Sequence, residues 1–557
     1  MNWKRFWIVT TLVLLTGITF YSFNRDDKNF QIAKNLEIYY SLFRELNMFY
    51  VDEVNPNTLV KTSIDQMLES LDPYTNYIPE DQMEDFRFMT TGEYAGIGAL
   101  IGKQKGKIII SEPYEGFPAQ KFGLKAGDII LKVEGKPTEN MSTEDVSSML
   151  KGPANKPVRL NVMRPGNNKP FEVNVVREKI VIDAIPYYGM LDKKTAYIRL
   201  SNFTANSGDA VRKAYLELKK ENPEAIILDM RSNPGGLLQE AVKIVNLFVP
   251  KGEEIVSTKG KVKQWDRTYT ATTAPIDTTI RIAVLTNSHS ASASEIVAGA
   301  IQDLDRGIVV GSRTFGKGLV QTTRDLSYNS KLKVTTAKYY TPSGRCIQSL
   351  DYTHRNEDGS AGNVPDSLIS EFKTKKGRTV FDGGGIVPDV VLEPEQLSNL
   401  SAALITNFLV FDYATLFSNT NESIASPEEF EITDEIYNEF SAFVKENNFE
   451  YESRSEQMLK ELIETAQKEK YFELASDEFD EMLVKLHPDV EKDLKVFSDE
   501  IKSLLKSEII SRYYYQKGAI RSSIDEDLVI QKAMEELRSS FSYNNYFNPD
   551  IIITMEK

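Results

Sequence analysis

The chain has 557 residues, which exceeds what one hydrophobic core supports, so several domains are expected. With 26% charged and 41% hydrophobic residues, the composition is that of a globular protein and excludes a mostly disordered chain. The formal net charge of -15 argues against nucleic acid as a partner, while three histidines and a single cysteine argue against a metal site and exclude an internal disulfide.

An apolar segment, Phe6 to Phe23, follows Lys4 and Arg5 at the N-terminus. It carries no charge and is just long enough to span the hydrocarbon core of a bilayer. It lacks an A-x-A-like cleavage site, which favours a signal anchor within residues 1–25 over a removed signal peptide. A basic start before an apolar run is typical of export. We therefore expect a cell-envelope protein, anchored in the inner membrane, with the rest of the chain in the periplasm or otherwise outside the cytoplasm.

The pattern of apolar residues then divides the chain. Residues 26–91 have helical spacing and predict a helical N-terminal region. From 92 to 177 the period changes to two, which predicts a small, mostly β module. In that module Ile129, Leu131 and Val133 are expected to point to one face of a strand.

Residues 178–395 alternate short apolar strands with periodic helices, which predicts an α/β core. The segment AIILDM, residues 225–230, is apolar enough to be a strand buried on both faces. Residues 396–557 are helical in pattern and rich in charge, and we expect them to form a solvated accessory region.

The first feature that carries chemistry is LDMRSNPGG, residues 228–236, where a predicted strand ends and a helix follows. Gly235 and Gly236 would let bare backbone amides approach a ligand closely, and such amides form oxyanion holes. A plain strand-to-helix turn explains the same residues without any function.

The second feature is a helix predicted to begin at about Ser292. Ser292 with Glu295 matches the S-x-x-E capping box, so helix capping alone explains this serine. A serine on a strand-to-helix turn also presents its hydroxyl beside free helix amides, as a catalytic nucleophile does. His289 precedes it on the incoming turn, and we interpret this histidine as a surface or packing residue.

The third feature is GSRTFGKG, residues 311–318, which resembles a phosphate-binding P-loop. Gly318 stands where that motif needs Ser or Thr, and the LVQTT that follows has the pattern of a strand, so we reject a nucleotide site. A lysine between glycines can serve as a general base once burial favours its neutral form. An exposed loop residue is the simpler interpretation of Lys317.

Together these motifs resemble the carboxyl-terminal processing proteases, the S41 serine peptidases. The resemblance runs from LDPYTNYI in the helical lead-in to about residue 395. It implies a crotonase-like α/β peptidase core at 178–395, with a PDZ domain inserted at 92–177 between the helical N-terminal region and an α-helical C-terminal region. The motifs, in chain order, are LDMRSNPGG, NSHSASASEIVAGAIQD, TFGKGLVQ, TPSGRCIQ and GGGIVPDVV.

The resemblance also assigns roles to single residues. It implies Ser292 as the nucleophile, Lys317 as the general base and Gln321 as the residue that orients the lysine. Backbone amides of Ala293, and of Gly235 or Gly236, would hold the oxyanion. Such an enzyme needs no catalytic histidine, and we expect no cofactor and no metal.

A PDZ domain takes an extended peptide as an added strand and holds its terminal carboxylate on backbone amides of a glycine loop. We therefore expect protein or peptide substrates with free, unstructured C-termini. Binding of an internal segment, gating of the active site and homo-oligomer formation stay open. The carboxylate loop is expected at EYAGIG, which comprises Glu93, Tyr94, Ala95, Gly96, Ile97 and Gly98.

Two rival functions come from other classes. A noncatalytic, PDZ-bearing periplasmic binding protein would keep the same residues for structure, but it would be free to lose any of the serine, lysine and glutamine. A crotonase-like enzyme acting on thioesters would also use glycine amides for an oxyanion. The predicted PDZ domain and the lack of a nucleotide-binding pattern count against it.

Overall fold

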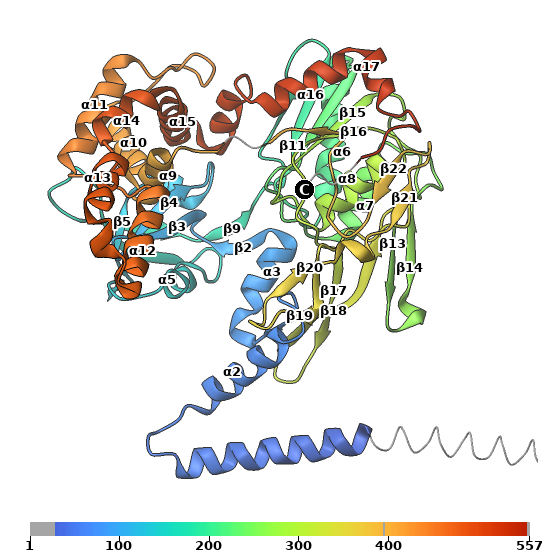
Figure 1. The fold of residues 1–557 in the computed structure, drawn as a ribbon, viewed down its shortest axis with the longest axis horizontal. Coiled ribbons are helices and arrows are strands. Elements are labelled where there is room, and N and C mark those ends of the chain that lie inside the picture. Colours follow the sequence, from blue (N-terminus) through green and yellow to red (C-terminus); the bar gives the residue numbers. More distant parts are fainter. Residues whose placement is uncertain (1–27, 394–395, 554–557) are drawn as a thin grey trace, which may run out of the picture. The chain divides into compact units, whose positions relative to one another are not determined.

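The computed structural model describes residues 28–393 and 396–553 (Figure 1). The described chain forms two compact units, which adjoin in sequence between Tyr77 and Ile78. The predicted anchor, Phe6 to Phe23, lies outside the described residues.

The first unit is largely helical. Residues 28–49 are helical, and α2 (Pro56–Glu69) follows after a short turn. The α2 helix begins at Asn55, whose side-chain oxygen accepts hydrogen bonds from the amides of Asn57 and Thr58. The short strand β1 (Asn76–Ile78) lies at the boundary of the two units.

The second unit begins with η1 (Glu80–Gln82) and α3 (Met83–Thr91). Two antiparallel strands, β2 (Glu93–Gly96) and β9 (Glu178–Val181), then carry the chain into and out of a β module. Its sheet has the order β3-β4-β5-β7-β8, with β6 paired to β5. Its elements are β3 (Ala99–Gln104), β4 (Lys107–Pro113), α4 (Pro118–Lys121), β5 (Ile129–Val133), β6 (Lys136–Pro137), α5 (Thr143–Leu150), β7 (Pro157–Met163) and β8 (Phe171–Val176).

One expectation for this module is wrong. Ile130 and Val133 are the fully buried residues of β5, whereas Ile129 and Leu131 are only partly buried. The reason is a register shift in the pairing with β7, between Ile130 and Lys132. Because a bulge adds a residue on one strand, it reverses the faces on either side of it, and simple alternation fails there.

The core of the second unit is a six-stranded sheet of order β10-β11-β12-β15-β16-β23. The pair β10 and β11 is antiparallel, and the remaining pairs are parallel. Every residue of β12 is buried, as predicted for a central strand. The strands are β10 (Tyr187–Met190), β11 (Thr195–Arg199), β12 (Ala225–Asp229), β15 (Arg281–Thr286), β16 (Ile308–Gly311) and β23 (Val390–Val391).

Helices α6 (Ser207–Leu218), α7 (Leu238–Asn246) and α8 (Ala293–Asp303) pack on one face of this sheet in a single apolar cluster. A second, antiparallel sheet of order β17-β18-β13-β14 adjoins them. Its strands and the short elements nearby are η2 (Lys219–Glu221), β13 (Glu254–Gly260), η3 (Lys263–Trp265), β14 (Arg267–Thr270), β17 (Leu319–Asp325), β18 (Lys331–Tyr340), β19 (Leu350–Arg355), β20 (Ala361–Asn363), η4 (Asp366–Leu368), β21 (Glu371–Lys373) and β22 (Thr379–Phe381).

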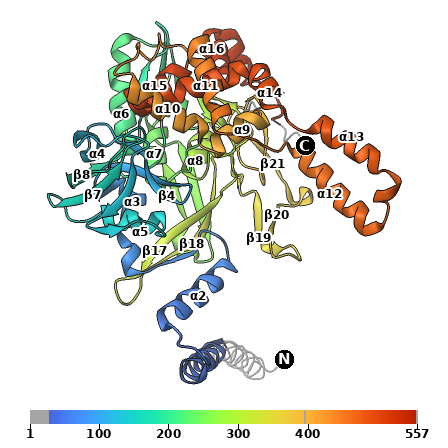
Figure 2. The same cartoon turned by 90° about the vertical axis from the view of Figure 1, so that its left-hand side faces the viewer.

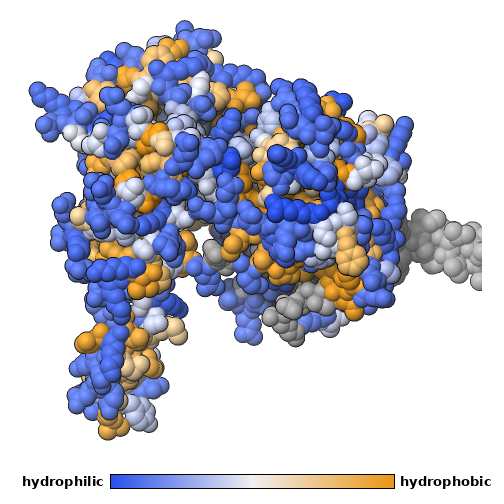
Figure 3. Space-filling view, turned by 90° about the horizontal axis from the view of Figure 1, so that it is seen from above, coloured by the Kyte–Doolittle hydropathy of each residue, from blue (hydrophilic) through white to orange (hydrophobic). Residues whose placement is uncertain are grey.

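The C-terminal region is helical, as expected. Figure 2 shows α12 and α13 projecting from the other helices of this region. The face of the molecule in Figure 3 is mostly hydrophilic, with apolar side chains in separate patches. The helices are α9 (Asn399–Thr406), α10 (Leu409–Thr420), α11 (Asp434–Glu446), α12 (Arg454–Glu469), η5 (Phe472–Leu474), α13 (Ser476–Leu486), α14 (Val490–Val496), α15 (Ser498–Ser523), α16 (Leu528–Arg538) and α17 (Ser540–Asn545).

The expectation that this whole region is a solvated accessory is wrong for its last two helices. Helices α16 and α17 cover the face of the core sheet opposite α6, α7 and α8 (Figure 1). Ile530 and Leu537 are fully buried there against residues of β12, β15 and β16. Arg231 ties the helix down, because it pairs with Asp527 at the start of α16 at 2.7 Å. The C-terminal region therefore completes the core.

Other helices of the region contact the β module. Asp412 of α10 accepts two hydrogen bonds from Gln104 at the end of β3, at 2.8 and 3.0 Å. The hydroxyl of Tyr515 in α15 accepts one from Gln120 at 2.5 Å. Within the described residues no single helix has both the length and the apolar composition to cross a bilayer. The helices α9 and α10 meet that test only as a pair bent by 61°.

Candidate active site

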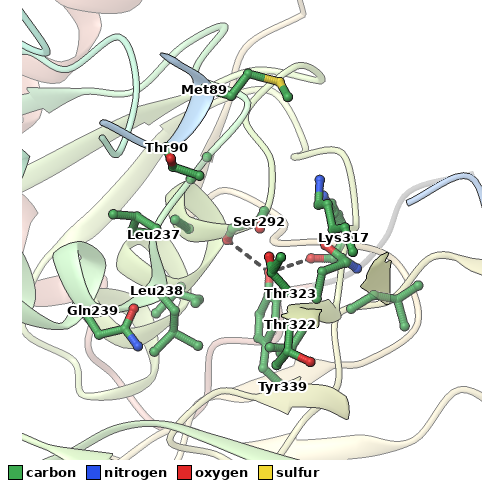
Figure 4. Close-up of a pocket in the computed structure, with 18 of the residues that line it drawn as sticks. Met89, Thr90, Leu237, Leu238, Gln239, Ser292, Lys317, Thr322, Thr323 and Tyr339 are labelled. Atoms are coloured by element: carbon green, nitrogen blue, oxygen red, sulfur yellow. Dashed lines mark hydrogen bonds between the residues drawn. The ribbon is translucent and has the colours of Figure 1, made fainter. Parts of the chain in front are cut away.

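A pocket of about 890 Å³ lies in the second unit and contains the predicted nucleophile. Its walls come from α3, from the Pro234–Leu238 turn, from the start of α8 and from strands β17 and β18. Ser292 and Lys317 both line it (Figure 4). The two residues are separated by 25 positions in sequence, and the fold brings them to one cavity.

Ser292 stands immediately before α8, as predicted, in a conformation that serine rarely adopts. Its φ is 55° and its ψ is -111°. Non-glycine residues held in such regions cost on the order of 1–3 kcal/mol and are found mainly at functional sites. The turn follows β15 and places the residue at the carboxyl end of the parallel sheet, where ligands of α/β folds bind.

The glycine pair lies directly against this serine. Gly235 has φ 97°, and a Cβ on it would come within 2.8 Å of the Ser292 Cβ, so only glycine fits. The Gly235 amide donates to the Asn233 side-chain oxygen at 2.9 Å. In the described part of the chain no acceptor is bonded to the amides of Gly236 and Ala293. Of the two glycines predicted for an oxyanion hole, Gly236 is thus the one whose amide is open to a ligand.

Glycines also shape the loop that carries Lys317. Gly316 has φ 86°, and a Cβ on it would meet the Ser349 hydroxyl at 2.4 Å. The Gly318 amide donates to the Gln348 side-chain oxygen at 2.8 Å. The strand β17 follows at Leu319, as the LVQTT pattern predicted, whereas a P-loop requires a helix here.

Glu295 connects the serine turn to the lysine loop. Its carboxylate is fully buried and accepts from the Ser292 amide at 2.8 Å and from the Lys317 amide at 2.9 Å. It also accepts from the Thr314 hydroxyl at 2.6 Å and the Gly316 amide at 2.7 Å. Burial raises the pKa of the Glu295 carboxyl to about 7, while these hydrogen bonds act to lower it. One carboxylate therefore sets the positions of both backbone segments.

Tyr339 makes a second connection between the same segments. Its hydroxyl lies 2.6 Å from the carbonyl oxygen of Lys317 and 3.0 Å from that of Ser292, and it can donate to either (Figure 4). The ring is buried, on the strand β18. Glu295 binds the amides of the two segments and Tyr339 binds their carbonyls, so the spacing of the two backbone segments is fixed from both sides.

Gln321 also lines the pocket, two residues into β17. Its side-chain amide donates to the Thr335 hydroxyl on β18 at 3.1 Å. The pairing of β17 with β18 shifts register between Val320 and Gln321, and such a bulge re-aims side chains. The predicted role of Gln321 in orienting the lysine stays a prediction. His289 is exposed, as expected, and is absent from the described residues that line the pocket.

The predicted carboxylate loop divides between a strand and a turn. Glu93 to Gly96 form β2 and pair with β9, so only Ile97 and Gly98 belong to the turn before β3. The phenol of Tyr94 folds back over this turn. Burial raises the pKa of its hydroxyl, and hydrogen bonds from the amides of Ala99 and Gly98 act to lower it.

Sequence reasoning missed several residues that build the site. Asn233 is fully buried and shapes the glycine turn, donating to the Leu200 carbonyl at 2.8 Å. Thr314, Tyr339 and Gln348 are likewise remote from Ser292 in sequence. Asn233, Thr314 and Gln348 lie within the motifs of the resemblance but received no role there, and Glu295 appeared only as a helix cap. Among residues 28–393 and 396–553 no group of three or more His, Cys, Asp or Glu is placed to hold a metal ion.

Comparison with known families identifies three parts of the chain. The model "Peptidase family S41" matches residues 194–354, and a PDZ domain model matches residues 109–164. The model "Probable PDZ-protease, C-terminal helical domain" matches residues 400–537. The chain thus has an S41 peptidase core, a PDZ domain and a helical C-terminal region.

Curated relatives and solved structures carry related names. A carboxy-terminal-processing protease of Bartonella bacilliformis is 36% identical over 324 residues, 58% of this chain and 74% of that protein. A probable CtpA-like serine protease of Staphylococcus aureus is 34% identical over 342 residues, 61% and 68% of the two chains. The solved photosystem II D1 C-terminal processing protease is 29% identical, covers 64% of this chain and 87% of its own, and has a TM-score of 0.36.

Proposed function

The chain belongs to the carboxy-terminal-processing proteases of peptidase family S41, and we propose that it cleaves protein substrates near their C-termini with Ser292 as nucleophile and Lys317 as general base. One observation supports this dyad above the others. The backbones of both residues are hydrogen-bonded to the Glu295 carboxylate, at 2.8 and 2.9 Å, in one pocket. This carboxylate holds the lysine loop beside the serine turn, as a serine and lysine dyad requires.

The proposed reaction proceeds by acyl transfer. The neutral Lys317 amine takes the Ser292 proton as the hydroxyl oxygen attacks the scissile carbonyl carbon. The carbonyl oxygen becomes an oxyanion, which the amides of Ala293 and Gly236 stabilise. The C–N bond then breaks, and the Lys317 ammonium returns the proton to the leaving amine. Water attacks the ester, gives a proton to Lys317 and releases the new C-terminal carboxylic acid, while Ser292 regains its proton.

The experiment that tests the proposal compares wild-type protein with Ser292→Ala on a denatured substrate, with product masses measured over time. We expect fragments shortened from the C-terminus with wild type and essentially none with Ser292→Ala. Binding without cleavage by wild type would instead support the noncatalytic binding protein. Equal cleavage by both forms would exclude Ser292 as the nucleophile.

We also propose that the PDZ domain selects substrates by their terminal carboxylate. Gly98 has φ 70°, and the turn that it forms before β3 carries the backbone amides that would receive a carboxylate oxygen. Replacing the C-terminal carboxylate of a peptide with an amide removes a charged acceptor, so binding should weaken by about 1.5–3 kcal/mol. Equal affinity for the acid and the amide would contradict this selection.

We propose further that the segment Phe6 to Phe23 anchors the protein in the inner membrane, with the catalytic region in the periplasm or otherwise outside the cytoplasm. The support is its uncharged length after a basic start. Removing residues 1–25 should leave a soluble protein with its activity. If the complete chain is expressed and the protein is recovered in the soluble fraction without its N-terminal segment, the anchor is contradicted.

A further inference from the structure

The pocket around Ser292 has the opposite charge from the chain as a whole. The sequence contains 81 Asp and Glu against 66 Lys and Arg, so several carboxylates would be expected among the pocket's many lining residues. No acidic side chain is present among the described residues that line it. The basic lining residues are Arg267, Arg324, Lys333 and the proposed general base, Lys317.

Trp265, which also lines the pocket, connects two of these cations, Arg324 by stacking and Arg267 by its position in the chain. Arg324 on β17 lies over the ring of Trp265, with its guanidinium carbon 4.6 Å from the ring centroid. Trp265 ends the turn that leads to Arg267, the first residue of β14. A guanidinium that stacks on an indole uses its flat face, so the N–H groups at its edge stay available. Two of these N–H groups can donate to the two oxygens of one carboxylate. The stacking thus holds Arg324 ready for an acidic ligand.

The neighbouring carboxylates do not neutralise these arginines. Asp325 is next to Arg324 in sequence, but successive side chains of a strand point to opposite faces. Asp325 instead forms an ion pair with Lys331. Asp266, next to Arg267, accepts from the Gly260 amide at 2.8 Å and lies 3.7 Å from Lys263.

The absence of a counter-charge extends to the rest of the described chain. Within residues 28–393 and 396–553 neither Arg267 nor Arg324 has an acidic side chain in ion-pair distance. Their charge is therefore open to a ligand.

The length of β17 determines how far Arg324 lies from the Lys317 loop, and so which residue of a bound substrate it can reach. The strand begins at Leu319, just after the loop of Lys317, and Arg324 is the sixth of its seven residues. An extended chain advances about 3.3 Å per residue, so Arg324 lies roughly 17 Å along the strand from Leu319. A substrate strand in the pocket spans the same length with about five residues.

We propose that Arg267 and Arg324 form a carboxylate-binding subsite of the substrate cleft, which favours substrates with an acidic group about five residues from the scissile bond. This inference rests on the proposed function of Ser292. The acidic group has two sources with the same chemistry, an Asp or Glu side chain or the C-terminal carboxylate of the substrate itself.

The test uses peptides that share one cleavable apolar segment and carry Asp, or Asn in its place, three to seven residues to either side of the cut. With amidated C-termini, wild type should have a kcat/KM for the best Asp peptide roughly fivefold above its Asn partner, the effect of one partly exposed ion pair. Arg324→Gln and Arg267→Gln should bring that ratio close to one. In Arg324→Glu, a Lys peptide should replace the Asp peptide as the better substrate. Arg212→Gln, an exposed change on α6, is the matched control and should keep the ratio.

Neutral peptides with a free or amidated C-terminus distinguish the two sources. If the gain from the free C-terminus disappears in Arg324→Gln, the terminal carboxylate is the ligand. An Asp to Asn ratio of one at every position, together with no effect of Arg324→Gln on the free C-terminus, overturns the subsite. Binding of the same peptides to Ser292→Ala, measured by fluorescence anisotropy, gives the ratio without turnover. A failure of Ser292 as nucleophile is thereby distinguishable from a failure of the subsite.

Discussion

Changing Glu295 to Gln tests the idea that one carboxylate positions both catalytic segments. The substitution keeps the size of the side chain but replaces one acceptor oxygen with an NH₂ group. That NH₂ faces two donors, either the Ser292 and Lys317 amides or the Thr314 hydroxyl and Gly316 amide. Two hydrogen bonds to a charged group are lost, at about 1.5–3 kcal/mol each, while the cost of burying the charge is removed. We therefore expect the unfolding free energy to fall by less than the roughly 3–6 kcal/mol of the two bonds.

The same substitution should change catalysis through geometry. A shift of about 1 Å between reacting groups costs roughly 10²-fold in rate, so kcat/KM of Glu295→Gln should fall by about that factor or more. The pKa of Glu295 near 7 adds a second readout. Only the ionised carboxylate accepts all four hydrogen bonds, so wild-type activity should decline as pH falls through about 7. The corresponding step should be missing from the pH profile of Glu295→Gln.

The unfolding free energy should depend on pH differently in wild type and in Glu295→Gln, and the raised pKa of Glu295 fixes the direction of the difference. The folded pKa of about 7 lies above the ordinary value of 4.5, so the folded state holds the proton more tightly than the unfolded state. The unfolding free energy of wild type should therefore decrease between about pH 4.5 and 7, by about 3 kcal/mol at 1.36 kcal/mol per pH unit, and not change further above pH 7.

Denaturant titrations of both forms between pH 4.5 and 8 measure this difference. An identical pH slope in wild type and Glu295→Gln would refute the assignment of the raised pKa. Near wild-type kcat/KM in a folded Glu295→Gln enzyme would refute the positioning role.

Three further changes have expected outcomes. Tyr339→Phe removes the hydroxyl 2.6 Å from the Lys317 carbonyl, and one hydrogen bond is worth about 0.5–1.5 kcal/mol. We therefore expect kcat to fall about two- to tenfold with KM nearly unchanged, and an equal kcat would contradict this role. Gly235→Ala would place a Cβ 2.6 Å from the Ala291 carbonyl at φ 97°, so peptide hydrolysis should be abolished, and an active, folded variant would show that the turn adapts. Ending the chain before α16 exposes one face of the core sheet, where each buried large side chain contributes about 1.5–3 kcal/mol, so the truncated protein should lose its cooperative melting transition.

Local patterns predicted the parts of the site that depend on local backbone structure. The strand-to-helix turn before Ser292, the glycine pair after β12 and the strand after Lys317 each follow from a few adjacent residues. Helical spacing likewise predicted α16, because amphipathicity depends only on the helix itself.

The missed features depend on contacts between distant segments. The capping pattern identified the bond from Glu295 to the Ser292 amide, but the bond to Lys317 crosses 22 residues and has no local signal. Tyr339 appears in the sequence as one residue of an alternating strand, and its two carbonyl partners are visible only in the fold. For α16 the sequence shows an apolar stripe but not the surface that it covers, which is why a solvated helix was expected.

The most direct test of the central claim is the kcat/KM of Lys317→Arg on a peptide with a free C-terminus, measured from pH 6 to 10. Arginine keeps the positive charge but does not act as a base in a protein. His289→Ala serves as the control, because that residue is exposed and outside the pocket lining. If Lys317 is the general base, Lys317→Arg should lose roughly 10²-fold or more while His289→Ala keeps its activity. A folded Lys317→Arg enzyme with near wild-type kcat/KM, or an inactive His289→Ala enzyme, would contradict the Ser292 and Lys317 dyad.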